Sequence, residues 1–138
     1  MTQALPTTIR HPKTFQNSPP AGYDGVFDWS WTAGCFGGGR ITPMDIDGVV
    51  ERKGQFLVFE TKNMGVPIPK GQLYTLERLH RLNCFTIMII YGKQRPETCE
   101  CWYPGTTARR ILSSKQEAID FVANWYRWAD QQGWRASQ

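Results

Sequence analysis

Residues 43–62 read PMDIDGVVERKGQFLVFETK, and this stretch decides the fold. Two runs within it, residues 47–50 and 55–62, are rich in β-branched and aromatic residues, and Gly54 separates them. Runs of this kind on either side of a glycine are typical of strands joined by a tight turn. The stretch therefore predicts an antiparallel hairpin whose two loop residues are Lys53 and Gly54.

This hairpin determines which residues face its acidic side chains. Paired positions sum to a constant around a two-residue loop, so Asp47 falls opposite Glu60, and Asp45 falls opposite Lys62. Directly opposed residues have Cβ atoms roughly 4.5–5.5 Å apart. Alternate residues of one strand share a face. Four polar side chains therefore converge at one end of an otherwise apolar hairpin.

Such a cluster of charges suits one kind of chemistry. Two adjacent carboxylates repel each other unless one is protonated or a cation lies between them. Carboxylate oxygens favour Mg²⁺ or Mn²⁺, and Mg²⁺ typically combines one or two carboxylates with waters and a substrate phosphate. With the ammonium group of Lys62 beside it, the set suits metal-assisted attack of water on a phosphodiester. The alternative is a solvated hairpin end with two ion pairs.

The spacing of these residues resembles a known motif. Asp47-Gly48 followed by Glu60-Thr61-Lys62 resembles the motif of the PD-(D/E)xK nuclease superfamily, in which an aspartate on one strand precedes D/E-x-K on the next. More narrowly, the hairpin resembles those of small phage-encoded nucleases of the VRR-NUC and Holliday-junction-resolvase-like kinds. An isoleucine replaces the usual proline, which leaves Asp45 as a second candidate aspartate; the following glycine and the register favour Asp47. The resemblance covers residues 40–90 well.

The resemblance implies a restriction-endonuclease-like α/β domain that acts as a metal-dependent deoxyribonuclease. Asp47 and Glu60 would bind Mg²⁺ or Mn²⁺, with the backbone carbonyl of Thr61 as a third ligand. Lys62 would orient or deprotonate the attacking water, or stabilise the charge that develops on phosphorus. Gln72 resembles a glutamine on the helix after the hairpin and would steady the water.

The resemblance also directs attention to the residues before the hairpin. A helix with an acidic residue often precedes the hairpin in this superfamily, and Asp24 or Asp28 could supply that further ligand. A turn position for Asp24 and a helix cap for Asp28 are the alternatives. Residues 1–22 contain four prolines among polar residues and are predicted to form an extended or partly disordered arm. The nuclease-like domain is then expected to span residues 23–138.

The charge of the chain is compatible with DNA as a partner. Its formal net charge is +4 and its pI is about 9.0, which are mildly basic values. Binding to phosphates by Lys and Arg predicts affinity that falls with salt. The residues expected to form a positively charged rim are Arg40, Lys53, Lys70, Arg109 and Arg110. Solvated positions are the alternative for Lys70 and the arginine pair.

The rest of the chain predicts a mixed sheet between helices. A helix is expected over residues 71–83, and the apolar run at 85–91 predicts a strand covered on both faces and parallel to the second hairpin strand. A further strand is expected at 98–103. Ser113 or Ser114 would cap a last helix ending near residue 132. Its predicted packing stripe is Ile119, Val122, Ala123 and Tyr126. Together these elements predict a central sheet of four or five strands.

Several function classes remain open. Four cysteines suit a reducing compartment without obligatory disulfides, and the N-terminus lacks the apolar core of a signal peptide, so a cytosolic location (phage or host cell) and no membrane partner are expected. The nuclease is expected to be an endonuclease, on branched or phage DNA by analogy, and a homodimer would suit cutting of two strands. The alternatives are a catalytically silent nucleic-acid-binding or inhibitor protein and an accessory protein that acts through its aromatic N-terminal segment.

Overall fold

The computed structural model describes residues 29–133. The chain divides into two units, residues 1–45 and 46–138. The predicted arm, its boundary at residue 22, and the candidate ligands Asp24 and Asp28 lie outside the described residues. The described part of the first unit contains a 3₁₀ helix, η1 (Ser30–Thr32), and a loop in which Gly34 and Gly37 have positive φ angles.

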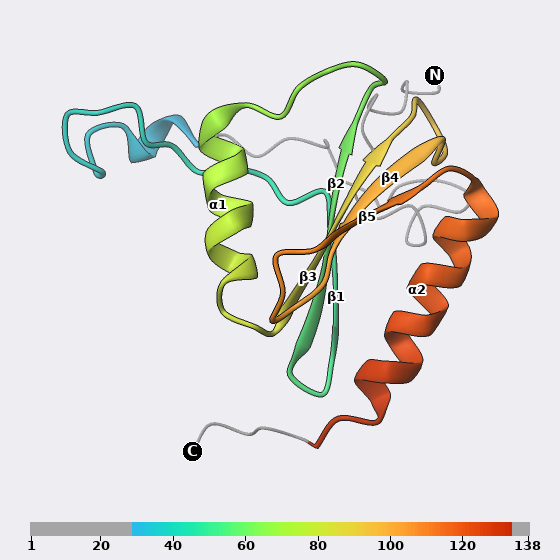
Figure 1. Ribbon diagram of the computed structural model, residues 1–138. Helices are drawn as coiled ribbons and strands as arrows, with labels where there is room; N and C mark the ends of the chain where they lie inside the picture. Colours follow the sequence, from blue (N-terminus) through green and yellow to red (C-terminus); the bar gives the residue numbers. More distant parts are fainter. Residues whose placement is uncertain (1–28, 134–138) are drawn as a thin grey trace, which may run out of the picture. The chain divides into compact units, whose positions relative to one another are not determined.

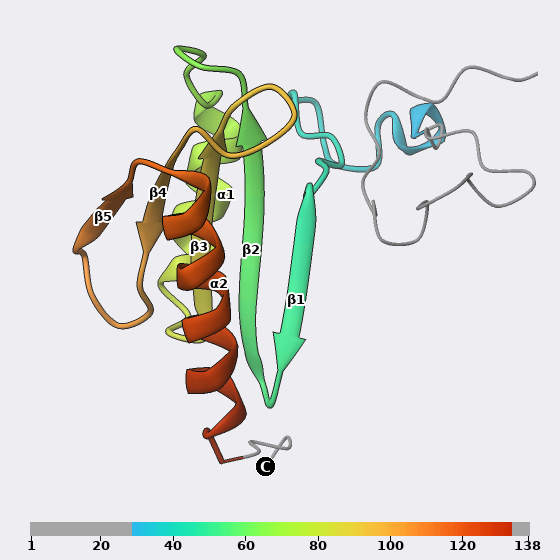
Figure 2. The same ribbon diagram turned by 90° about the vertical axis from the view of Figure 1, so that its right-hand side faces the viewer.

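A five-stranded mixed sheet forms the centre of the second unit, in the order β1-β2-β3-β4-β5. Only β2 and β3 run parallel; the other neighbours are antiparallel. Figures 1 and 2 show one helix on each face of the sheet. The α/β fold expected from the sequence is confirmed. The elements are β1 (Gly48–Arg52), β2 (Gln55–Lys62), α1 (Lys70–His80), β3 (Phe85–Tyr91), β4 (Thr98–Trp102), β5 (Arg109–Leu112) and α2 (Lys115–Asp130).

The predicted hairpin register is confirmed. Gly48 pairs with Phe59 and Arg52 with Gln55, so Lys53 and Gly54 are the two loop residues. Both have positive φ angles, 50° and 81°, as a two-residue turn of type I′ requires. Continuing this register one pair beyond the ladder places Asp47 opposite Glu60.

Alternation along the central strands divides the core into two layers. Leu57 of β2 packs with α2 residues, whereas its neighbour Val58 packs with Leu76 of α1. The same alternation in β3 places Met88 in the α2 layer and Ile89 in the α1 layer. Because β2 and β3 are buried on both faces, their sequences read as nearly continuous apolar runs.

Both helices differ in detail from the prediction. α1 ends at His80 rather than at residue 83, and Asn83 has a positive φ of 63° that a helix cannot contain. The predicted packing stripe of α2 was right for Val122, which packs against the core, and wrong for Ile119 and Tyr126. Ile119 and Tyr126 are 49% and 47% exposed, because rotation of the helix buries larger rings instead. The residues of α2 that are buried are Ala118, Phe121, Trp125 and Ala129.

The start of α2 follows the predicted capping pattern. Ser114 is the N-cap, and its side chain accepts a hydrogen bond of 3.1 Å from the backbone N–H of Glu117. The Glu117 carboxylate accepts in turn from the backbone N–H of Ser113 at 2.9 Å. Both serines therefore take part in the cap.

His80, Cys99 and Cys101 have structural positions in the second unit. His80 is only 9% exposed; its Nε2 lies 2.6 Å from the carbonyl oxygen of Tyr103, and its ring meets that of Trp102 edge-on. Cys99 and Cys101 are buried free thiols. Burial raises the pKa of the Cys101 thiol to about 12. No helix within residues 29–133 has the length and apolar character needed to cross a membrane.

Candidate active site

The polar cluster lies at the end of the hairpin opposite the turn. β2 and β3 run parallel, so both finish at this end of the sheet. The loop after β2 leads directly into α1, whose first turn lies at the same end (Figure 1). The sheet thus places Asp47, Glu60 and Lys62 where two strand ends and a helix N-terminus come together.

Asp47 is fixed by the residue next to Glu60. One carboxylate oxygen of Asp47, Oδ2, accepts two hydrogen bonds from Thr61, one from the backbone N–H at 2.8 Å and one from the side-chain hydroxyl at 3.0 Å. Two donors on one oxygen hold the carboxylate against β2. The Asp47 carboxylate also lies within hydrogen-bonding reach of Glu60, which is one of the causes that raise the pKa of Glu60.

Glu60 is a buried carboxylate beside an ammonium group. It is 2% exposed, and its Oε1 lies 3.2 Å from the Nζ of Lys62, whose side chain is 20% exposed. Burial, followed by the negative charge of Asp47, raises the pKa of Glu60, while Lys62 opposes that shift. Two carboxylates are therefore held together at a cost that one ammonium group only partly relieves.

The backbone of Thr61 also points to this cluster. In a parallel pair, alternate residues direct their N–H and C=O groups to opposite neighbours. The backbone of Phe56 bonds toward β3, and so does that of Lys62, whose carbonyl accepts from Gly92 N–H at 2.9 Å. Thr61 therefore directs both backbone groups away from β3. Its N–H reaches Asp47, and its carbonyl points to the same side, beyond the end of β1.

The donor set fits one hard divalent cation. Within residues 29–133 no group of three or more His, Cys, Asp or Glu side chains is placed to hold a metal ion. Mg²⁺ commonly uses only one or two carboxylates and completes its octahedron with waters and substrate oxygens. Asp47, Glu60 and the carbonyl of Thr61 meet that requirement. Zinc sites typically include nitrogen or sulfur ligands, and no described His or Cys belongs to this cluster.

Sequence reasoning missed two neighbours of the cluster. Tyr91 pairs with Lys62, and Glu100 lies across Ile89 from Glu60, about two strand spacings or 9.5 Å away. Burial and the charge of Glu100 raise the pKa of the Tyr91 hydroxyl, while Lys62 lowers it. The sequence held a signal for Tyr91. The two apolar runs that form β2 and β3 end at Lys62 and just before Gly92, and aligning these ends of the parallel strands pairs Tyr91 with Lys62.

The other predicted site residues lie on other parts of the chain. Gln72 and Lys70 occupy the first turn of α1, at the correct end of the sheet, half-buried and exposed respectively. Arg40 and Asp45 belong to the first unit. Lys53 lies at the turn, about 20 Å along β2 from Glu60, and donates to the backbone carbonyl of Asp130 at 2.6 Å.

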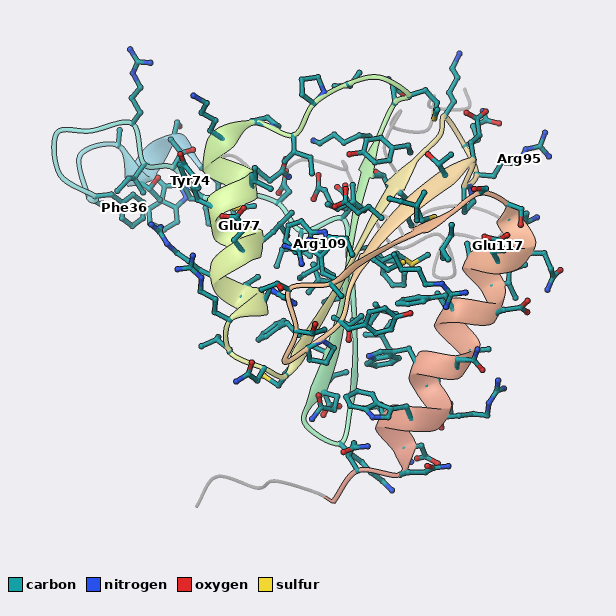
Figure 3. The ribbon with its side chains drawn as sticks, viewed as in Figure 1. Phe36, Tyr74, Glu77, Arg95, Arg109 and Glu117 are labelled. Atoms are coloured by element: carbon teal, nitrogen blue, oxygen red, sulfur yellow. The ribbon has the colours of Figure 1, made fainter. Side chains whose placement is uncertain are left out.

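The arginine pair of β5 is divided between the two faces of the sheet. Arg109 pairs with Trp102 and stacks on its ring at 4.0 Å, on the side of α1 (Figure 3). Arg110 pairs with Cys101 on the side of α2. The four predicted rim cations of the second unit are therefore not gathered in one place, and contact of the rim with DNA stays a prediction.

Comparison with protein-family models, with curated proteins and with solved structures finds no match to this chain. The arrangement of the residues themselves is therefore the basis for assigning a function.

Proposed function

We propose that this protein is a metal-dependent nuclease of the PD-(D/E)xK kind that hydrolyses DNA phosphodiester bonds, most simply as an endonuclease. The observation that supports this proposal is the hairpin end itself. A buried glutamate, whose pKa is raised by burial and by Asp47, is held beside a lysine. Strained carboxylate pairs of this kind are concentrated at functional sites, because a structural ion pair has no need of the second negative charge.

The residues of the cluster have separable roles in this proposal. Asp47, Glu60 and the carbonyl of Thr61 would hold Mg²⁺ or Mn²⁺, which when bound supplies a water of lowered pKa and neutralises phosphate charge. Thr61 keeps Asp47 in place through its two hydrogen bonds. Glu60 holds the Lys62 ammonium group near the reacting phosphate, where it orients the attacking water or stabilises the developing charge.

The elements around the cluster suit a DNA substrate. Lys70 is exposed in the first turn of α1, and a helix N-terminus favours the negative charge of a phosphate. Gln72 lies in the same turn, and its proposed role is to steady the attacking water. The buried free thiols of Cys99 and Cys101 suit a reducing cytosol. A homodimer would allow both strands of a duplex to be cut.

The test is cleavage of circular plasmid and of a four-way DNA junction in Mg²⁺, in Mn²⁺ and in EDTA. We expect metal-dependent cutting by the wild type and loss of at least about 100-fold in Glu60→Gln, which keeps the shape of the side chain but removes its charge. Glu97→Gln is the matched control, because Glu97 is exposed in the loop between β3 and β4. Cutting that survives Glu60→Gln would refute the proposed site.

One observation favours a second candidate, a catalytically silent DNA-binding or inhibitor protein. Asp47 Oδ2 and Glu60 Oε1 already have partners in Thr61 and Lys62. A cluster satisfied in this way could serve only to bind or to stabilise. Retention of DNA on a gel, without cutting in either metal, would select this candidate.

A further inference from the structure

A separate cavity lies on the α2 face of the sheet. Its volume is about 350 Å³, and it opens between α2 and the strand ends of β4 and β5. Four aromatic side chains supply most of its wall, and Thr86, Pro104, Arg110 and Asn124 complete the lining. The residues that argue for a ligand are Tyr103, Arg110, Phe121, Asn124, Trp125 and Trp128. None of them belongs to the cluster around Glu60.

Arg110 is the charged group of this cavity, and it differs from other arginines of the sheet. Arg52 pairs with Asp130, and Arg109 lies near Glu100. Arg110 instead donates to the neutral hydroxyl of Tyr103 at 3.3 Å and forms no ion pair with any described carboxylate. Its guanidinium group is therefore free to bind an anion at the edge of an aromatic cavity.

The wall also contains a buried polar group without a partner. Trp125 is 6% exposed, and its indole N–H is buried with no hydrogen-bond acceptor. A buried donor left unpaired costs about 1–3 kcal/mol. A ligand with an acceptor atom in this cavity would remove that cost. Asn124 at the rim presents an amide, whose oxygen is already bonded by Arg127.

The chemistry of the wall specifies the occupant. Aromatic side chains stack on flat rings, and an arginine at the edge binds phosphate. A nucleobase with its phosphate has both features, and it also offers ring acceptors to the indole and amide donors. A volume of about 350 Å³ lies at the lower end of the range for ligand pockets, about 300–1,000 Å³. This volume suits one nucleotide.

We propose that this cavity binds a single unpaired nucleotide of a DNA strand, with its base among the aromatic side chains and its phosphate on Arg110. The inference rests on the proposed nuclease function and deepens it, because it assigns a substrate class. A site for an unpaired base, on the face opposite the cleavage cluster, selects DNA that carries a single-stranded or branched segment over a continuous duplex.

Calorimetric titration in EDTA tests this site without requiring cleavage. The probes are thymidine, thymidine monophosphate, a five-residue oligothymidylate and a blunt duplex of mixed sequence. We expect the oligothymidylate to bind the wild type most tightly, thymidine monophosphate next and thymidine at least about tenfold more weakly than its monophosphate. Arg110→Ala and Trp128→Ala should each weaken oligothymidylate binding by about tenfold or more, as loss of a phosphate contact or a stacking surface does.

Controls separate this inference from the proposed function. Arg78→Ala removes an exposed arginine of α1 whose one described contact is with the Tyr74 ring, and it should leave binding unchanged. Arg110→Lys, which keeps the charge, should bind better than Arg110→Ala, and circular dichroism shows whether each variant is folded. Glu60→Gln should bind as the wild type does, even though its cleavage is lost.

Three results would overturn the inference. Oligothymidylate binding by the wild type that neither Arg110→Ala nor Trp128→Ala weakens would place the nucleotide elsewhere. Binding of thymidine monophosphate without the oligothymidylate would assign the cavity to a free nucleotide rather than to a DNA strand. If neither thymidine monophosphate nor the oligothymidylate binds the wild type, the cavity is not a nucleotide site. Nucleotide binding without any cleavage would instead refute the nuclease proposal and keep the cavity assignment.

Discussion

The two ends of the β1–β2 hairpin both carry clusters of charge, and they are built in opposite ways. At the turn, Arg52 donates to Asp130 of α2 at 2.7 Å, and Lys53 also reaches Asp130, with side chains that are roughly 40% exposed. At the open end, Glu60 is buried beside Asp47, and among residues 29–133 its ion-pair partner is Lys62. The turn balances Arg52 and Lys53 against Asp130 and Glu51, whose carboxylate accepts from Gly54 N–H, whereas Asp47, Glu60 and Lys62 leave the open end with an excess negative charge.

The pKa shifts at the two ends have opposite signs. Hydrogen bonding to Arg52 lowers the pKa of Asp130, so the charged form is favoured where it stands. Burial and Asp47 raise the pKa of Glu60, so the charged form is disfavoured. A lowered carboxylate pKa is typical of a structural ion pair, and a raised one is typical of a site kept for binding or catalysis. The sign of the carboxylate pKa shift, rather than the presence of charge, therefore distinguishes the two ends of the hairpin.

The largest expected effect is on cleavage at the open end. Lys62→Ala should reduce the rate of metal-dependent plasmid cutting by about 10²–10³-fold, because it removes the group that stabilises charge at the phosphate. It should also move the acid limb of the pH–rate profile to higher pH, since Lys62 opposes the raised pKa of Glu60. Lys115→Ala, at the exposed start of α2, is the control. An unchanged rate in Lys62→Ala would remove the functional distinction between the two ends.

The next effect is on stability at the same end. The folded pKa of Glu60 is raised above its ordinary value of 4.5, so its protonated form favours folding, and the wild type loses that stability as pH rises through the folded pKa. Glu60→Gln should therefore raise the melting temperature at pH 8 by about 2–5 °C. The gain should shrink as pH falls toward 4.5. Thermal unfolding of the variant and the wild type at both pH values measures this gain. A lower melting temperature of Glu60→Gln at pH 8 would contradict the view that charged Glu60 destabilises the fold.

The smallest effect is expected at the turn, with the opposite sign. The folded pKa of Asp130 is lowered, so its charged form stabilises the protein above the ordinary value of 3.8, and this contribution is lost as pH falls through the folded pKa. Asp130→Asn should lower the melting temperature at pH 7 by about 1–3 °C, because exposed ion pairs contribute little. Below about pH 3 the difference should vanish. Asp120→Asn, in the same helix and bonded to Gln116, is the reference.

Much of the scaffold could be predicted from local pattern. The period-two and apolar runs gave the hairpin, β3 and β4, and the positive φ angles at Lys53 and Gly54 follow from the two-residue turn. Because that turn fixes the register, the sequence alone could place Asp47 opposite Glu60. The rotation of α2 about its axis could not be predicted. Phe121 and Trp125 are buried against the sheet and Ile119 is exposed, and this depends on packing against strands that are distant in the sequence.

The amino-acid sequence by itself determined the α/β class, the hairpin register and the grouping of Asp47, Glu60 and Lys62, because these depend on residues close together along the chain. Tertiary structure alone decided what surrounds them. The burial of Glu60, the nearness of Tyr91 and Glu100, the pairing of Lys53 with Asp130 and the division of Arg109 from Arg110 all depend on strand order and helix rotation. Contacts between distant residues arise when whole layers pack, and no short stretch of sequence specifies that packing.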